Sequence, residues 1–176
     1  LYREVLARQL SYRLQMAINK PTWRWLTDEG RLDFPALLDA FLQWWRENEG
    51  AIYAHGNKQY PEALAHLAFM AFLQRVVNGG GQVTREFAAG RRAVDIVVCF
   101  GPDRFVVELK RVFKGGKSPN KVREEGTRQL AAYLDTLGQH QGWLIIFDQR
   151  KEKSWEQRLW EETVEMKGRM LHIRGA

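Results

Sequence analysis

Three charged side chains interrupt two otherwise apolar runs in the segment from Arg92 to Arg111, and their types and spacing could support chemistry. They are Asp95, Glu108 and Lys110. The two runs are rich in β-branched and aromatic residues and flank Gly101-Pro102-Asp103-Arg104. Proline at the second position of a four-residue turn has its φ already set, so the segment predicts an antiparallel hairpin.

The predicted hairpin brings the three charges together. With Pro102 and Asp103 at the centre of the turn, counting outward pairs Asp95 with Lys110, and directly paired residues share a face. Strand side chains alternate, so Glu108 lies on the same face as Lys110. The remaining positions of both faces are mostly apolar, which is typical of the covered centre of an α/β sheet.

Charges in such a place are costly unless they are paired or hold a metal ion. Hard oxygen ligands from Asp95 and Glu108 suit Mg²⁺ or Mn²⁺, which also bind substrate phosphate. The metal would polarise a phosphoryl oxygen and acidify a bound water, while Lys110 could orient that water. The pattern fits metal-assisted phosphodiester hydrolysis. The alternative is a solvated strand face on which Asp95 and Lys110 form an ordinary cross-strand ion pair.

The composition sets bounds on these interpretations. The chain has 176 residues, of which 45% are hydrophobic and 12% aromatic, and no apolar run is long enough to span a membrane. Its net charge of +6 favours a polyanionic partner such as DNA. A single cysteine, Cys99, excludes a disulfide framework and a zinc cluster of cysteines and favours a reducing, cytoplasmic location.

The first 58 residues are expected to form an N-terminal helical lobe, separate from a domain over 59–176. Apolar spacing predicts a helix from Leu1 to Ile18 and another from Pro35 to about Glu47, capped by Asp33. The segment from Asn48 to Tyr60 is expected to be a connection. The tryptophans of this lobe could bind a base or a partner, but aromatic residues at helical spacing are more typical of a core.

The second part of the chain shows helix, three strands, helix, strand, and a final hairpin. The first helix carries Glu62 and His66 on one face, and the second carries Gln129 and Tyr133, each pair four residues apart. This order predicts a mixed central sheet with helices packed on it. The expected elements are helices 61–78 and 121–137 and strands 82–88, 143–148, 160–166 and 169–174, besides the hairpin of 92–111.

This arrangement resembles the PD-(D/E)xK nuclease superfamily, whose restriction-endonuclease-like core is αβββαβ. The resemblance implies that Asp95 and Glu108 bind the metal with the Leu109 carbonyl, and that Lys110 assists the water. Glu62 takes the acidic position often found on the first helix. Gln129-x-x-x-Tyr133 looks like the QxxxY motif of the RecB-like branch, in which a histidine ligand would be His66. The choice between Glu62 and His66 stays open.

A second likeness covers nearly the whole chain, from Tyr2-Arg3-Glu4 through Gln129-Leu-Ala-Ala-Tyr133 to the last hairpin. These stretches look like the C-terminal nuclease-type region of bacterial AAA-ATPase-like proteins, which implies an upstream ATPase in the same polypeptide. The expected function is Mg²⁺- or Mn²⁺-dependent hydrolysis of DNA. The alternative is a catalytically silent nuclease-fold module that binds DNA or protein and serves the ATPase. The basic residues expected to track phosphates are Lys114, Lys117, Lys121, Arg123 and Arg128.

Overall fold

A computed structural model describes residues 25–55, 61–77, 81–89 and 92–176. The expected elements are found in the expected order within these residues, with one short helix over 155–158 that was not predicted. The predicted helix from Leu1 to Ile18 lies outside the described residues. The elements are α2 (Phe34–His55), α3 (Pro61–Val77), β1 (Gly81–Ala89), β2 (Arg92–Phe100), β3 (Asp103–Val112), α4 (Pro119–Thr136), β4 (Gln141–Asp148), α5 (Trp155–Arg158), β5 (Glu161–Met166) and β6 (Arg169–Gly175).

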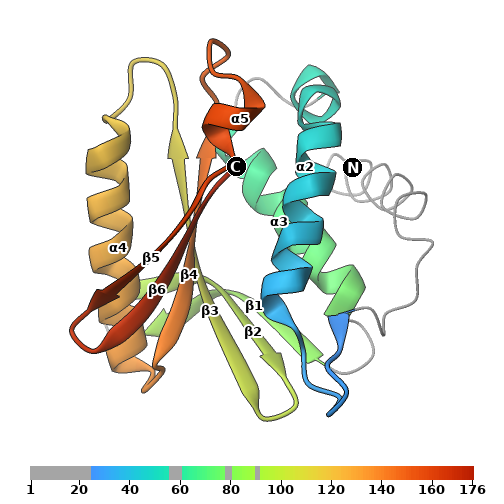
Figure 1. The fold of residues 1–176 in the computed structure, drawn as a ribbon, viewed down its shortest axis with the longest axis vertical. Helices are drawn as coiled ribbons and strands as arrows, with labels where there is room; N and C mark the ends of the chain where they lie inside the picture. The colour runs from blue at the N-terminus through green and yellow to red at the C-terminus, as the bar shows by residue number, and fades with distance from the viewer. Residues whose placement is uncertain (1–24, 56–60, 78–80, 90–91) are drawn as a thin grey trace. The chain divides into compact units, whose positions relative to one another are not determined.

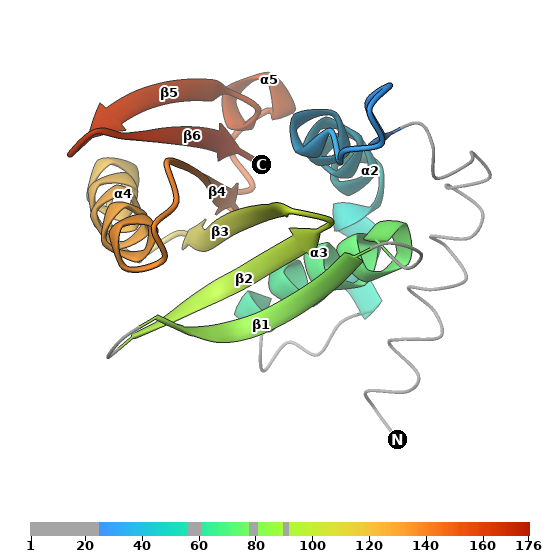
Figure 2. The same cartoon turned by 90° about the horizontal axis from the view of Figure 1, so that it is seen from below.

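The strands form one mixed six-stranded sheet in the order β1-β2-β3-β4-β6-β5 (Figure 2). β4 runs parallel to both β3 and β6, and β5 closes one edge antiparallel to β6. The fold is therefore α+β with a mixed sheet, as predicted. The α4 crossover explains the parallel β3–β4 pair, because parallel neighbours need a long connection.

Residue contacts divide the chain into two compact units. The first contains α2, α3, the start of β1 up to Val83 and the hairpin turn over Phe100–Asp103. The second contains Thr84–Cys99 and Arg104–Ala176, and so holds most of the sheet with α4 and α5. The sequence-based boundary between residues 58 and 59 stays a prediction.

The first unit is built on aromatic packing between α2 and α3. Asp33 caps α2 as expected, since its Oδ1 accepts a hydrogen bond from the Ala36 amide at 3.0 Å. Phe41 meets Phe69 and Phe72 edge to face, with ring centroids 4.6 and 5.4 Å apart. Trp25, Trp44 and Trp45 are buried, so the expectation that the tryptophans of this lobe belong to a core is confirmed for these three among the described residues.

The predicted connection from Asn48 to Tyr60 is wrong over its first part, because α2 continues to His55. The Asn48 side chain donates to the Trp44 carbonyl at 2.8 Å, one turn back. Tyr53 packs on Trp45 with ring centroids 5.9 Å apart. These contacts hold a polar, glycine-containing stretch in a helix that its own propensity does not favour.

The hairpin turn differs by one residue from the prediction. β2 ends at Phe100 and β3 begins at Asp103, so the central residues are Gly101 and Pro102. Gly101 has a φ of +54°, which glycine adopts without strain and which suits a two-residue hairpin. Counting outward without interruption now pairs Asp95 with Glu108 rather than with Lys110. The shift is two positions on one strand, so all three charges still share a face.

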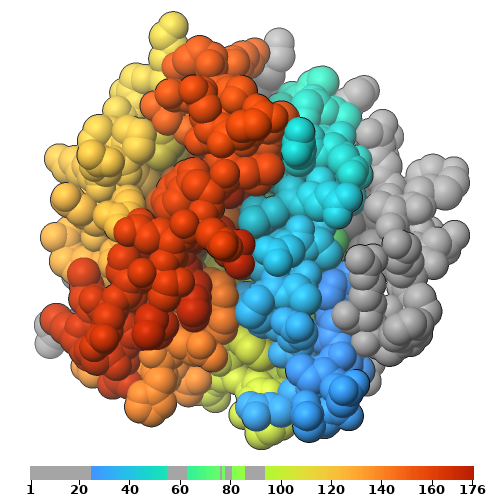
Figure 3. All heavy atoms as spheres, in the orientation of Figure 1, coloured from blue at the N-terminus to red at the C-terminus, as the bar shows by residue number. Residues whose placement is uncertain are grey.

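In the second unit, α4 packs on the sheet (Figures 1 and 2). The helix begins after Ser118, whose hydroxyl accepts from the Lys121 amide, with Pro119 in its first turn. Arg123 of α4 donates to Glu162 of β5 at 2.9 Å, and Figure 3 shows the surface of α4 near that of the β5–β6 hairpin. None of the described helices is both long enough and apolar enough to cross a bilayer.

Candidate active site on the α4 face of the sheet

The predicted charges lie on the sheet face that α4 covers. Glu108 and Lys110 are in register with Leu144 and Ile146 of the parallel neighbour β4, so all four point to the same side. A Cβ added at Gly126 of α4 would lie 3.1 Å from Lys110 Cγ. The stem of Lys110 is therefore packed beneath the helix, and the charged face is not an open, solvated one.

Asp95 joins β2 to β3 through its side chain. Its Oδ2 accepts a hydrogen bond from the Leu109 amide at 2.8 Å. The amide and carbonyl of one residue in an antiparallel strand point to the same neighbour. The Leu109 carbonyl is therefore on the edge of β3 that faces Asp95, as the expected third metal ligand requires.

Glu108 is a buried carboxylate with only 2% of its surface exposed. Its Oε1 accepts from Lys110 Nζ, whereas its Oε2 has no hydrogen-bond partner among the described residues. The pKa of Glu108 is raised to about 7, first by burial and then by the nearby charge of Asp95, which together outweigh the opposing effects of Lys110 and of a hydrogen bond with the Asp95 backbone. For Glu108 the alternative of a solvated strand face is wrong.

The helix α4 presents Gln129 and Tyr133 on the same side as Gly126, at spacings of three and seven residues. Gly126 lies against Leu144 of β4 and the stem of Lys110, and one turn further along the helix Leu130 lies over Gly142 of β4. Tyr133 is buried and Gln129 is half-buried. The structure thus places both residues of the predicted pair on the helix that covers the site.

Gly126 is a positioning residue that the sequence interpretation missed. An isolated glycine inside a strongly helical pattern was the available signal, because such a glycine often marks close packing. A Cβ at this position would lie 2.8 and 2.9 Å from the two Cδ atoms of fully buried Leu144, besides its contact with Lys110. The glycine allows α4 to approach the sheet directly above the charged group.

Replacing Gly126 by alanine is expected to lower the free energy of unfolding by about 1 kcal/mol. Overpacking costs roughly 1–3 kcal/mol, and the better helix propensity of alanine returns about 1 kcal/mol. Chemical denaturation of the full chain measures the change. The matched control is Glu124→Ala on the exposed side of α4, which should alter stability by less than about 0.5 kcal/mol. A Gly126→Ala protein more stable than wild type would contradict the close packing described above.

The predicted residues Glu62 and His66 lie on α3, in the first compact unit, whereas the three charges belong to the second. His66 is half-buried, and the side chain of Glu62 lies outside the described set. The choice between them as an additional ligand therefore stays a prediction.

The donor set of the site suits a hard divalent cation. Two carboxylates and a carbonyl supply oxygen ligands, and the buried Glu108 Oε2 is an acceptor without a hydrogen bond among the described residues. No group of three His, Cys, Asp or Glu side chains is gathered as a metal site within the described part of the chain. A cation here would depend on Asp95, Glu108 and backbone or water oxygens.

Comparison with known proteins gives one result at the family level. A family model described as a domain of unknown function (DUF8371) matches residues 36–151, which is more than half of the chain. The matched range contains α4, the hairpin of β2 and β3, and all of the candidate site residues. No curated protein sequence matches the chain.

Proposed function

The chain belongs to the DUF8371 family, and we propose that it is a divalent-metal-dependent nuclease domain of the PD-(D/E)xK type that hydrolyses phosphodiester bonds in DNA. The proposal combines the resemblance given above with the arrangement of the site. We also propose that the chain has the αβββαβ core of that superfamily. The order α3-β1-β2-β3-α4-β4 supports this part of the proposal.

The observation that carries the proposal is the buried carboxylate of Glu108. A side chain with 2% exposure, one unpartnered oxygen among the described residues and a second carboxylate nearby is unfavourable in the ionised state. Lys110 compensates one oxygen only. Such a group costs stability unless a cation binds the second carboxylate oxygen, and a metal-dependent active site needs a carboxylate of this kind as a ligand.

Asp95, Glu108 and the Leu109 carbonyl would hold Mg²⁺ or Mn²⁺. When bound, the metal supplies Lewis acidity toward the phosphoryl oxygen and lowers the pKa of a bound water. Lys110, anchored by its stem under Gly126, places its ammonium beside Glu108, where it can orient the attacking water and offset negative charge in the transition state.

Gln129 and Tyr133 support the site from α4. Gln129 is half-buried and can donate or accept a hydrogen bond, so it suits a phosphate oxygen or the water. Tyr133 is 4% exposed and fixes the packing of the helix on the charged face. We propose DNA as substrate because the chain carries a net charge of +6. The resemblance to the C-terminal region of AAA-ATPase-like proteins is the basis for proposing an upstream ATPase in the same polypeptide as its partner.

The test is cleavage of supercoiled, linear and single-stranded DNA by the full chain in Mn²⁺, in Mg²⁺ and in EDTA. We expect cutting in either metal and none in EDTA. Asp95→Asn should reduce the rate at least about 100-fold, since it removes one of two carboxylate ligands. Glu165→Gln, an exposed carboxylate on β5, is the matched control and should cleave as wild type does.

A second candidate, the catalytically silent binding module, is favoured by one specific contact. Lys110 is already paired with Glu108, and Asp95 is already bonded to the Leu109 amide, so the group is partly satisfied from within. In that case wild type and Asp95→Asn would be equally inert in both metals while both bind DNA. Titration calorimetry with Mn²⁺ then separates a metal-holding module from one in which the charges serve the fold alone.

A further inference from the structure

Basic side chains gather on one flank of α4 and in the loop before it. The segment 111–121 contains four basic residues and no acidic one, whereas the described residues as a whole include equal numbers of basic and acidic residues. The positive charge here is therefore a local feature of the second unit. Three exposed side chains, Lys117, Lys121 and Arg128, form what we call the basic flank.

The three cations surround one carboxylate, that of Glu125. Lys117 Nζ pairs with Glu125 Oε2 at 2.6 Å, and the two side chains are 56% and 28% exposed. The pKa of Glu125 is lowered, first by the hydrogen bond from Lys117 and then by the charges of Lys117, Lys121 and Arg128, against the opposing effect of burial. One carboxylate does not neutralise three cations, so the basic flank keeps an excess of positive charge.

The basic flank lies on the side of α4 that faces away from β5. Arg123 donates to Glu162 of β5 at 2.9 and 2.5 Å, so it marks the side of the helix nearest β5. Residues two apart on a helix point in nearly opposite directions, because successive residues are about 100° apart. Glu125 therefore points away from β5. Lys121 and Arg128, four residues before it and three after it, share its side of the helix.

The strand order shows which part of the sheet lies next to the basic flank. In the order β1-β2-β3-β4-β6-β5, the side away from β5 is the side of β3 and β2, which carry the hydrolytic group of Asp95, Glu108 and Lys110. Gly126 of α4 lies against the Lys110 stem. Gln129 is three residues from Gly126 and four from Glu125, so it neighbours both on the helix surface. It connects the basic flank to the hydrolytic group.

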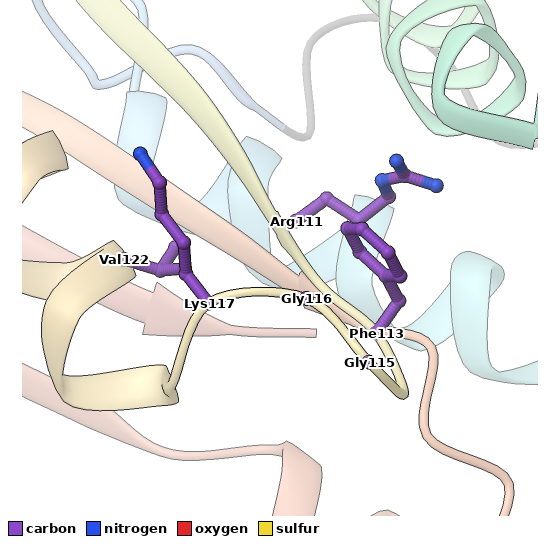
Figure 4. Close-up of a pocket in the computed structure, with 6 residues that line it drawn as sticks. All are labelled: Arg111, Phe113, Gly115, Gly116, Lys117 and Val122. Atoms are coloured by element: carbon purple, nitrogen blue, oxygen red, sulfur yellow. The ribbon is translucent and has the colours of Figure 1, made fainter.

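Arg111 is not part of this surface. Figure 4 shows Lys117 beside Val122 of α4, with its ammonium pointing away from the Arg111 guanidinium on the other side of β3. Arg111 is engaged there by the Phe113 ring, whose centroid lies 4.1 Å from its guanidinium carbon, and by Gln149 Oε1 at 3.3 Å.

We propose that the basic flank of Lys117, Lys121 and Arg128 binds the phosphate backbone of the nucleic acid and leads it along α4 to the hydrolytic group. The inference rests on the proposed function for the identity of the ligand. Lys121 and Arg128 are two helical turns apart, about 10 Å, so they reach different phosphates of a polyanion rather than one small anion. Each phosphate that they neutralise releases a counterion.

The pair between Lys117 and Glu125 is open to exchange. Exposed ion pairs contribute little to stability, so another anion can replace the carboxylate at small cost. A phosphate is such an anion, because it accepts several charge-assisted hydrogen bonds. Glu125 thus occupies Lys117 in the free protein and gives it up when the backbone binds.

The experiment measures binding apart from cleavage. Fluorescein-labelled single- and double-stranded oligonucleotides are titrated with the full chain in EDTA, over a series of salt concentrations, and followed by anisotropy. We expect the double variant Lys121→Gln, Arg128→Gln to weaken binding about tenfold and to reduce the slope of log K against log salt by about 2. The matched control, Arg123→Gln with Lys167→Gln, removes two charges from the β5 side of α4 and from the β5–β6 turn, and should change the affinity less than about twofold.

Two single variants test the exchange at Lys117. Lys117→Gln should weaken binding about threefold, because it removes one phosphate contact. Glu125→Gln should strengthen binding about threefold, because it removes a negative charge and releases Lys117. Unchanged thermal unfolding in each variant excludes loss of fold as the cause.

The outcomes separate the basic flank from the proposed hydrolysis. Equal binding by the double variant and its matched control overturns the inference, whether or not the wild type cleaves DNA, and so does a wild type that binds neither oligonucleotide. Binding that depends on the basic flank, without metal-dependent cleavage, supports the inference and contradicts the nuclease. If polyglutamate displaces the labelled strand as well as unlabelled oligonucleotide does, the flank takes acidic protein and the inference of a nucleic-acid ligand is overturned.

Discussion

Metal-dependent DNA cleavage is expected to fall at least about 100-fold when Lys110 is replaced by methionine. Loss of one preorganised group that stabilises transition-state charge typically costs about 10²- to 10³-fold in rate. Methionine keeps an unbranched apolar stem under Gly126, so the packing against α4 survives while the ammonium beside Glu108 is lost. The measurement is the initial rate of cleavage in Mn²⁺ and in Mg²⁺.

Two comparisons show whether the ammonium itself matters. Lys151→Met removes an exposed lysine in the turn after β4, outside the residues expected to contact phosphates, and should leave the rate within about twofold of wild type. Lys110→Ala also removes the stem, so it should lose the same activity and be less stable than Lys110→Met. If Lys110→Met cleaves as fast as wild type, Lys110 has a structural role only, and the assignment of the attacking water to it fails.

Replacing Glu108 by glutamine is expected to stabilise the metal-free protein above pH 7. It should also make the free energy of unfolding less dependent on pH, because glutamine does not titrate. The pKa of Glu108 is raised to about 7 by burial and by Asp95. An ordinary glutamate in the unfolded chain titrates near pH 4.3, so between these values the folded state binds the extra proton. The unfolding free energy of wild type therefore decreases as pH rises from about 4.5 through 7, by up to about 3 kcal/mol from this group.

Denaturation curves at pH 5 and pH 8 for wild type and Glu108→Gln measure this contribution as a difference between the two proteins. Glu165→Gln on β5 is the control and should change the free energy of unfolding by the same amount at pH 5 and at pH 8. Saturating Mn²⁺ at pH 8 should raise the stability of wild type, because a ligand that binds only the folded state stabilises it, and should do little for Glu108→Gln. A wild-type stability that rises between pH 5 and pH 8 relative to Glu108→Gln would contradict the raised pKa.

The sequence predicts much of the second unit because its signals are strong and local. The helix predicted from Lys121 is found as α4, which begins two residues earlier at Pro119, and the continuous apolar run of Trp143–Asp148 marks β4. Strand alternation places Asp95, Glu108 and Lys110 on one face whichever pair of residues forms the turn. The grouping of the site is for that reason robust to the one-residue error at Gly101.

Other features depend on contacts that no local pattern contains. The strand β6 lies between β4 and β5 in the sheet. This position depends on which strands pair with one another, and the sequence of a single strand is compatible with several pairing partners. The last part of α2 continues past the predicted end of the helix, where it contains Gly50 and is supported by Tyr53 packing on Trp45. The pairing of Lys110 with Glu108 rather than with Asp95 likewise follows from burial under Gly126, which spacing along the strands does not reveal.

The path of the chain through the two compact units has a consequence for folding. The chain passes from one unit to the other three times, at residues 83–84, 99–100 and 103–104. Arg31 and Asp103, separated by 72 positions, form a two-pronged ion pair that ties the hairpin turn to the segment before α2. The helical unit is thus complete only when the hairpin has formed, and its closure carries the entropic cost of a long loop. Such long-range closure slows folding and couples the two units, so neither should behave as an independently folding module.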